Sequence, residues 1–333
     1  MNNTRIALLG FGNVGRALAS YLSANESFRT QIEIAAVADS SGAVVLESPA
    51  QTEALLAHKN RGRALGECPV GRMISNQRAF ISALPGLGAP VLVESLPTNI
   101  SDGRPALDLI LPALSQGTNV VTVDKGPLVR GFHELRQAAL TSGARLAFTG
   151  TTGVAIPPEI GASGQVTEIR GVLNGTTNYI LSEMQQAGAA FSEALQRAQQ
   201  DGIAEPDPSL DLDGWDTACK ILILARALMS AAGSLEEVNR HGIGPQTESL
   251  IREGEAMGRV VKLIGRARIW QGRVRLSVAP KLVGPDSPFF SVAATSKAAI
   301  FRTGDREFVS HGRSGRDSIA ETIVEDILRV LAP

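Results

Sequence analysis

The sequence predicts an α/β fold in which a doubly wound parallel sheet precedes a second, α+β region. Three observations lead to this. Strand-like apolar runs alternate with helix-length segments through the first 150 or so residues, a GxGxxG pattern follows the first run, and the texture changes after about Thr152. Regular alternation of strands and helices implies βαβ crossovers and therefore a parallel sheet.

The elements follow in order along the chain. The first strand is predicted at RIALLG, and a helix begins at about Asn13. Further strands of the first region are expected at IEIAAVAD, PVLVES, NVVTVD and ARLAFTG. In the second region one strand is expected at VTEIRGVL, then several helices, then strands at RVVKLIGRARI, RVRLSVAPKLV and AAIFRTGDREFVSHG.

The C-terminal stretch DSIAETIVEDILRVL has an apolar stripe of helical spacing. Ile319, Ile323, Ile327 and Leu331 recur every four residues, so this face must pack on another element, most simply on the first region. We therefore expect a dinucleotide-binding domain over residues 1–152, completed by a C-terminal helix within 306–333. A substrate-binding and dimerisation domain is expected over 153–305.

Composition excludes several functions. The 333 residues carry a net charge of −1 without basic clusters, which argues against nucleic-acid and membrane partners. The two cysteines, Cys68 and Cys219, lie far apart, and the four histidines are scattered, so neither disulfides nor a thiolate–imidazole metal site is expected. No apolar run approaches the length of a signal peptide or a membrane span. A cytoplasmic protein with a small-molecule substrate is expected.

The glycine pattern GFGNVG stands at a strand-to-helix turn, as in the Rossmann type of dinucleotide-binding fold. The glycines allow a tight turn, close approach to a pyrophosphate and close helix packing, while helix N–H groups attract the anion. The predicted cofactor-binding residues here are Gly10, Gly12, Asn13, Val14 and Gly15.

Asp39 ends the second predicted strand, where a carboxylate accepts hydrogen bonds from the adenosine ribose. This favours NAD, because a carboxylate repels a 2′-phosphate. The following basic run HKNRGR supplies Lys59, Arg61 and Arg63, which either bind such a phosphate or form a solvated loop. The choice between NAD and NADP therefore stays open.

The segment AEPDPSLDLDGWDTACK places five carboxylates before Lys220 and a long apolar helix. A helix beginning near Leu212 puts Asp213, Asp216 and Lys220 on one face. On an exposed helix this is an ordinary surface ion pair. The apolar run ILILARALM indicates a buried helix instead, so a site is favoured, with carboxylates that suit a substrate ammonium and a lysine that binds a carboxylate or moves a proton.

Two further stretches carry polar groups at helix starts. In NGTTNYIL, Thr176 belongs to a polar loop that is either a site or an ordinary N-terminal cap. In TVDKGPL, Lys125 follows a parallel strand, at the edge where open α/β sheets bind ligands. That position, beside the nicotinamide end of a cofactor, favours a functional role over a surface lysine.

Taken together, these stretches and the runs ADSSG and ESLPTNISDGRPAL resemble homoserine dehydrogenase over essentially the whole chain, in its short form without a regulatory domain. The resemblance implies NAD(P)-dependent interconversion of L-homoserine and L-aspartate 4-semialdehyde, within threonine and methionine biosynthesis. It implies that Lys125 and Lys220 are the catalytic lysines. It further implies a substrate site formed by the residues Glu205, Asp211, Asp216 and Thr176, with Pro97, Thr98 and Lys125 against the nicotinamide. A homodimer formed through the sheet of the second region is also implied.

The chain departs from the family pattern at several places. Ile203 stands where many members have an aromatic residue, Asp124 where they often have Asn, and Arg313 where a small residue is usual. The run FTGTTGVAIP differs from a glycine-rich loop that binds a monovalent cation in some members. In this chain the corresponding cation site would be formed by the backbone of Thr149, Thr152 and Val154. Two alternatives remain: a sibling dehydrogenase of another amino-acid aldehyde or alcohol, and a catalytically silent NAD(P)-binding protein.

Overall fold

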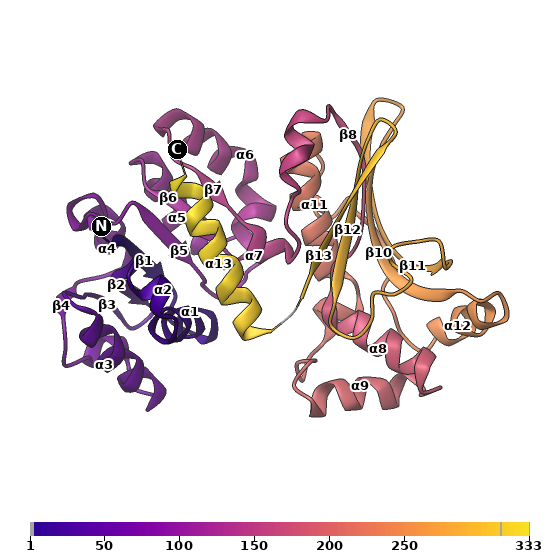
Figure 1. Ribbon diagram of the computed structural model, residues 1–333, viewed down its shortest axis with the longest axis horizontal. Helices are drawn as coiled ribbons and strands as arrows, with labels where there is room; N and C mark the ends of the chain where they lie inside the picture. The colour runs from indigo at the N-terminus through magenta and orange to yellow at the C-terminus, as the bar shows by residue number, and fades with distance from the viewer. Residues whose placement is uncertain (1–2, 314, 333) are drawn as a thin grey trace. The chain divides into compact units, whose positions relative to one another are not determined.

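The computed structural model describes residues 3–313 and 315–332, which form two compact units (Figure 1). The first unit comprises Met1–Thr151 and Gly315–Pro333, and the second comprises Thr152–Ser314. The chain thus leaves the first unit once and returns to it for the last helix.

The first unit is built on a seven-stranded sheet of order β4-β3-β2-β1-β5-β6-β7. Its strands are β1 (Thr4–Leu9), β2 (Ile32–Asp39), β3 (Gly42–Val45), β4 (Arg72–Ile74), β5 (Val91–Glu94), β6 (Asn119–Thr122) and β7 (Leu146–Ala147). The central strands β2, β1, β5, β6 and β7 run parallel, whereas β3 and β4 add an antiparallel edge. The strand order reverses beside β1, so the switch point at which such sheets bind ligands lies between β1 and β5. The predicted Rossmann-type sheet is confirmed.

The helices of the first unit connect these strands. They are α1 (Asn13–Ala24), α2 (Glu26–Arg29), α3 (Pro49–Asn60), α4 (Gln77–Ala83), α5 (Ala106–Ser115), α6 (Lys125–Ser142), α7 (Thr149–Thr152) and α13 (Arg316–Leu331), with the 3-10 turns η1 (Leu65–Glu67) and η2 (Pro85–Leu87). The strands are almost continuously buried, as expected for a parallel sheet covered on both faces.

The last helix belongs to the core of the first unit. Ile323 and Ile327 of α13 are fully buried in a cluster with strand residues such as Val121, and the helix packs against α1 and against β5, β6 and β7 (Figure 1). Its fully buried Asp326 accepts hydrogen bonds from the backbone N–H and the hydroxyl of Thr149, at 2.8 and 2.7 Å, and so fastens α7. Of the described residues within 306–333, where this helix is expected, only Arg316–Leu331 are helical. Residues 306–312 form a strand of the second unit.

The second unit has a six-stranded sheet of order β13-β12-β8-β10-β11-β9. The strands are β8 (Val166–Val172), β9 (Asn239–Arg240), β10 (Val260–Trp270), β11 (Arg273–Val283), β12 (Lys297–Thr303) and β13 (Arg306–Gly312). The helices are α8 (Gly175–Gln186), α9 (Phe191–Gln200), α10 (Ser209–Leu212), α11 (Trp215–Met229) and α12 (Thr247–Ala256), with the 3-10 turn η3 (Pro158–Ala162). The pairs β8–β10, β10–β11, β8–β12 and β12–β13 are antiparallel, which confirms an α+β region.

Helix α11 packs on one face of this sheet. A Cβ placed on Gly265 of β10 would lie 2.9 Å from the Thr217 side chain and 3.3 Å from that of Ile221, so the glycine lets the helix approach closely. Residues 221–225 of the helix are all completely buried. The helix is therefore enclosed on every side, as its apolar sequence predicts.

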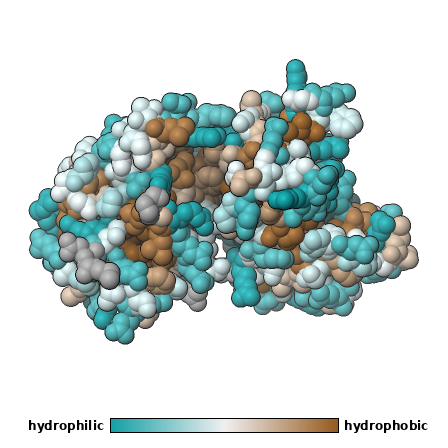
Figure 2. Space-filling model, turned by 45° about the horizontal axis from the view of Figure 1, so that its top comes forward, coloured by the Kyte–Doolittle hydropathy of each residue, from teal (hydrophilic) through white to brown (hydrophobic). Residues whose placement is uncertain are grey.

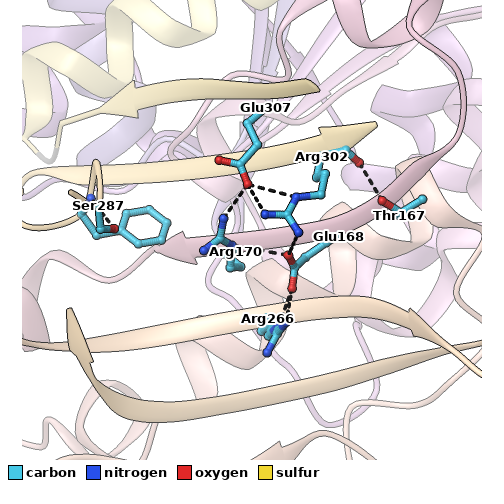
Figure 3. A network of polar contacts seen from close by, with 8 residues as sticks. Thr167, Glu168, Arg170, Arg266, Ser287, Arg302 and Glu307 are labelled. Atoms are coloured by element: carbon cyan, nitrogen blue, oxygen red, sulfur yellow. Dashed lines mark hydrogen bonds and ion pairs between the residues drawn. The ribbon is translucent and has the colours of Figure 1, made fainter. Parts of the chain in front are cut away.

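The other face carries a polar network, named here the outward face: Glu168, Arg170, Arg266, Arg302 and Glu307 (Figure 3). Side chains two residues apart share one face of a strand, which places this set opposite the α11 side. Arg266 Nε lies 2.5 Å from the Glu168 carboxylate, and Arg302 lies 3.4 Å from it. Glu307 joins Arg170 and Arg302, so arginines surround the mostly buried Glu168.

Most of the molecular face in Figure 2 is hydrophilic or intermediate, with hydrophobic side chains in separate areas. No helix within residues 3–313 or 315–332 is long and apolar enough to cross a membrane. The same residues contain no group of three or more His, Cys, Asp or Glu side chains placed to hold a metal ion.

Candidate functional site

The glycine loop between β1 and α1 is shaped for an anion. Gly10 has a φ of 102°, and a Cβ there would lie 2.6 Å from the Ser95 carbonyl oxygen. A Cβ on Gly15 would lie 2.3 Å from the Gly10 carbonyl oxygen, so α1 packs onto the turn only because both residues are glycines.

The start of α1 is open to a ligand. A Cβ on Gly12 would meet no atom of the chain within 4 Å. Gly12 precedes the helix without a side-chain cap, and the first intrahelical bond runs from the Arg16 N–H to the Gly12 carbonyl. The N–H groups of Asn13, Val14 and Gly15 thus have no intrahelical acceptor, as at any helix start. These residues fit a bound pyrophosphate.

Asp39 ends β2 with both carboxylate oxygens engaged. One oxygen accepts from the backbone N–H and hydroxyl of Ser41, at 2.7 and 2.6 Å, and the other lies 2.7 Å from Lys59 Nζ. Burial opposes ionisation, but the hydrogen bonds from Lys59 and Ser41 outweigh it and lower the pKa of Asp39. Of the basic run, Lys59 thus turns to Asp39, while Arg61 and Arg63 are exposed.

The carboxyl ends of β5 and β6 bring two predicted segments together. Pro97 and Thr98 follow β5, and Lys125 begins α6 directly after the cap residue Asp124. The Asp124 carboxylate accepts from the Gly126 N–H at 2.8 Å and from the Thr98 hydroxyl. Thr98 and Lys125 therefore lie on adjoining turns at the sheet edge that also carries the glycine loop.

A second carboxyl group, which the sequence reasoning did not single out, lies beneath these turns. Glu94, the last residue of β5, is fully buried and bonds to the Leu96 N–H at 2.7 Å and to the Thr122 hydroxyl at 2.5 Å. Burial and the nearby charge of Asp124 raise its pKa to about 8.

In the second unit, Lys220 lies in a buried cluster of polar groups. Its ammonium donates to an Asp216 carboxylate oxygen at 2.7 Å and to the Leu173 carbonyl at 2.9 Å. The pair is separated by one helical turn, but both side chains are buried, with 9% and 6% exposed, so an ordinary surface pair is excluded.

Asn174, the cap residue of α8, connects the carboxylates of this cluster. Its amide nitrogen donates to Asp211 at 2.6 Å and to Asp216 at 2.9 Å, and its oxygen accepts from the Thr177 N–H at 2.7 Å. The position of Asn174 at the start of a predicted helix indicates a cap, but it does not by itself predict a role in the site. The structure thus unites Asp211, Asp216 and Lys220 through this asparagine.

Two predicted substrate residues do not join the cluster. Thr176 donates to the Ile203 carbonyl at 3.1 Å, which fixes the segment before α10 to helix α8. Glu205 is exposed, and within the part of the chain that the structure describes its carboxylate makes no hydrogen bond or ion pair.

The expected helix from Leu212 to Lys220 is wrong in one respect. Gly214, with a φ of 81°, separates α10 from α11, so Asp213 does not share the helix face of Asp216 and Lys220. A left-handed residue stops the helix because it turns the backbone out of the α conformation.

The segment that corresponds to the family's cation-binding loop makes contacts within the chain. The Val154 carbonyl accepts from the Thr152 hydroxyl at 2.9 Å, and a Cβ on Gly153 would lie 2.6 Å from the Lys297 ammonium nitrogen. A lysine ammonium beside Gly153 disfavours a second cation next to it. Arg313 is exposed at the end of the second unit, and the adjoining Ser314 lies outside the described residues.

Comparisons with known proteins cover both units. The family model described as "Homoserine dehydrogenase, NAD binding domain" matches residues 10–149, and "Homoserine dehydrogenase" matches 156–328. A homoserine dehydrogenase of Methanocaldococcus jannaschii is 33% identical, covering 98% of each chain, and an NAD(+)-dependent one of Pseudomonas canavaninivorans is 30% identical, covering 99% of this chain and 97% of that protein. The crystal structure of a homoserine dehydrogenase from Thiobacillus denitrificans matches with a TM-score of 0.80 at 27% identity, over 99% of this chain and 73% of that one.

Proposed function

The chain belongs to the homoserine dehydrogenase family, and from this premise we propose how its residues divide the work of the reaction. The enzyme is an NAD(P)-dependent oxidoreductase that interconverts L-homoserine and L-aspartate 4-semialdehyde. The observation that carries the residue assignment is the buried cluster of Lys220, Asp216, Asn174 and Asp211.

We assign the substrate ammonium group to Asp211 and Glu205. Asp216 is unsuited to this task, because its carboxylate already receives the Lys220 ammonium and the Asn174 amide. Asp211 shares only the neutral amide, and Glu205 is exposed. Thr176 holds the chain segment that leads to Glu205 by its bond to Ile203.

Lys220 and Lys125 are assigned to the acid–base step. Bound cofactor supplies or accepts the hydride at the carbon that bears the oxygen. When the aldehyde is reduced, negative charge develops on that oxygen, and a lysine ammonium stabilises the charge and gives up a proton. Asp216 orients Lys220 for this task, and the Asp124 cap fixes the turn that presents Lys125.

The residues of the first unit support NAD as the preferred cofactor. Asp39 is ionised at neutral pH, since its pKa is lowered, and a carboxylate at this strand end accepts ribose hydroxyls and repels a 2′-phosphate. Lys59 partly offsets that charge from 2.7 Å away. NADP is therefore disfavoured without being strongly rejected.

The reaction and its residues are tested by following NADH absorbance with purified protein, L-homoserine, and NAD or NADP in parallel. Lys125→Ala is expected to reduce kcat by at least about 100-fold. Lys281→Ala, which removes an exposed lysine of β11, serves as the control and keeps wild-type rates. Full activity of Lys125→Ala would overturn the role of that lysine, and rapid oxidation of another amino-acid alcohol in place of homoserine would support the sibling dehydrogenase.

We further propose a cytoplasmic homodimer formed through the outward face of the second unit. This face carries both arginines and glutamates, so a two-fold axis can place opposite charges together. Trp270 and Val309 are unusually exposed for apolar residues, at 51% and 40%, and alternate onto the same face. Trp270→Glu should shift the mass measured by light scattering to that of a monomer, whereas Leu140→Glu, at an exposed site of the first unit, should not.

A further inference from the structure

Glu94 is a buried carboxyl group that the scheme above does not use. It ends β5 at the cofactor edge, with Leu9 of β1 as its neighbour on one side and Thr122 of β6 on the other. Its side chain is fully buried. A carboxyl group in such a place costs free energy unless its hydrogen bonds compensate, so its contacts are informative.

The Glu94 side chain joins the loop after β5 to the turn after β6. One carboxyl oxygen accepts the Leu96 N–H at 2.7 Å, and the other lies 2.5 Å from Thr122 Oγ1. The same Thr122 oxygen accepts the Asp124 N–H at 3.0 Å. A continuous chain of hydrogen bonds thus runs from Leu96 to Asp124.

The two segments also touch each other directly. Thr98 donates to the Asp124 carboxylate, and a Cβ on Gly126 would lie 2.4 Å from the Asn99 carbonyl oxygen. A small displacement of either segment therefore displaces the other. The buried Glu94 side chain is bonded both to the loop after β5 and to Thr122 at the end of β6.

We propose that Glu94 is a positioning residue that holds the loop of Pro97 and Thr98 in register with the turn of Lys125 at the cofactor edge. The proposal rests on the role assigned above to Lys125. It goes beyond that role, because Glu94 acts on cofactor binding as well as on the lysine.

The protonation state of Glu94 gives the proposal a distinctive pH dependence. Burial, then the charge of Asp124, raises its pKa to about 8, so near neutral pH the group is a neutral acid. The charged groups on this side are Asp124 and, beside it, Lys125. Ionised Glu94 would repel the Asp124 carboxylate, which loosens the two segments.

Three variants separate positioning from simple loss of stability. Glu94→Gln keeps the acceptor for the Leu96 N–H and a polar group against Thr122 but cannot ionise, whereas Glu94→Leu keeps neither polar contact. Thr122→Val removes the link to Asp124. Thr118→Val is the matched control, a buried threonine just before β6. For each, we would measure kcat and KM for homoserine oxidation, the Kd for NADH by fluorescence, and Tm, over a pH series that crosses the Glu94 pKa.

Glu94→Leu and Thr122→Val should lower kcat by about 10-fold to 100-fold and weaken NADH binding, since small misplacements of catalytic groups are costly. Glu94→Gln should recover most of both losses. The ratio of its kcat to that of the wild type should rise as pH passes about 8, because only the wild type ionises there.

Wild-type kinetics and NADH affinity in folded Glu94→Leu would overturn the proposal. A Glu94→Gln variant as impaired as Glu94→Leu, or a ratio that stays flat across the pH series, would do the same. If Lys125→Ala keeps full activity, the role of that lysine fails, but the NADH measurement still decides for or against Glu94.

Discussion

Each unit buries carboxyl groups near a lysine, but the two units neutralise the negative charge differently. In the second unit, Asp216 is ion-paired with Lys220 inside the protein. In the first unit, Glu94 has only neutral hydrogen-bond partners and keeps its proton, with its pKa raised to about 8. A carboxylate counter-ion thus holds the charged lysine in place for the reaction. A carboxyl group that keeps its proton instead holds backbone segments together, and it makes the cofactor edge of the sheet sensitive to pH.

The largest effect is expected where the counter-ion is lost. Lys220→Met should lower kcat by about 100-fold to 1000-fold and also destabilise the fold, because the buried Asp216 carboxylate loses the Lys220 ammonium. Steady-state rates and thermal melts measure the two effects separately. Adding Asp216→Asn should restore Tm but not kcat. Recovery of activity in the double variant would show that Lys220 has only a structural role.

A smaller effect is expected at the residue that connects the acids. Asn174→Ala should lower kcat/KM for homoserine by about 10-fold, because Asp211 and Asp216 lose the amide that separates their charges, and should cost about 1 kcal/mol of stability through the lost helix cap. Thr177→Val is the control, because it removes a hydroxyl that donates to Asn174 Oδ1 at 3.0 Å but keeps the Asn174 amide nitrogen that joins the two acids. Equal losses of kcat/KM in both variants would contradict a bridging role.

The proton on Glu94 predicts a pH-dependent difference in stability. Its folded pKa of about 8 lies above the ordinary value of 4.5, so the group stabilises the fold fully below the ordinary value and loses this contribution as pH rises to about 8. The Tm of Glu94→Gln minus that of the wild type should therefore increase over this window and level off above it. A difference that does not change with pH would show that Glu94 is ionised in the folded protein.

The smallest effect is expected at an ion pair of the first unit that is less buried than Asp216 and Lys220. It tests whether the effect of a counter-ion depends on burial as well as on the unit. Lys59 and Asp39 form an ion pair in the first unit, with 17% and 13% of their side chains exposed. Lys59→Ala should raise the NAD preference over NADP by a few fold, roughly 1 kcal/mol or less, because Asp39 is then left unopposed. Initial rates with each cofactor measure this, with Arg61→Ala as the control. A shift toward NADP would mean that Lys59 does not compensate Asp39.

The sequence predicts the parallel sheet, the glycine loop, the buried helix α11 and the packing of the last helix, because each depends on local patterns of apolar residues and glycines. It also predicts that Asp216 and Lys220 lie together, since they are one helical turn apart. Such features require no knowledge of which strands are neighbours.

The remaining contacts depend on register between distant segments. In the sequence Glu94 looks like an ordinary residue at the end of a strand. Only the pairing of β5 with β6 places it opposite Thr122. Asn174 reads as a helix cap, and only the folded second unit brings it to Asp211, 37 residues along the chain. The break at Gly214 is not predicted, because the spacing of Asp213, Asp216 and Lys220 fits an uninterrupted helix equally well.

The return of the chain to the first unit has a consequence for biosynthesis. A ribosome delivers Thr4–Leu9 before the second unit and residues 316–331 after it, yet Ile323 and Ile327 complete the same core. Two fully buried isoleucines contribute roughly 3–6 kcal/mol, a large fraction of the stability of an ordinary domain. The core of the first unit therefore stays incomplete until α13 has been synthesised. The second unit is one continuous segment of the chain, so it can fold before the first unit does.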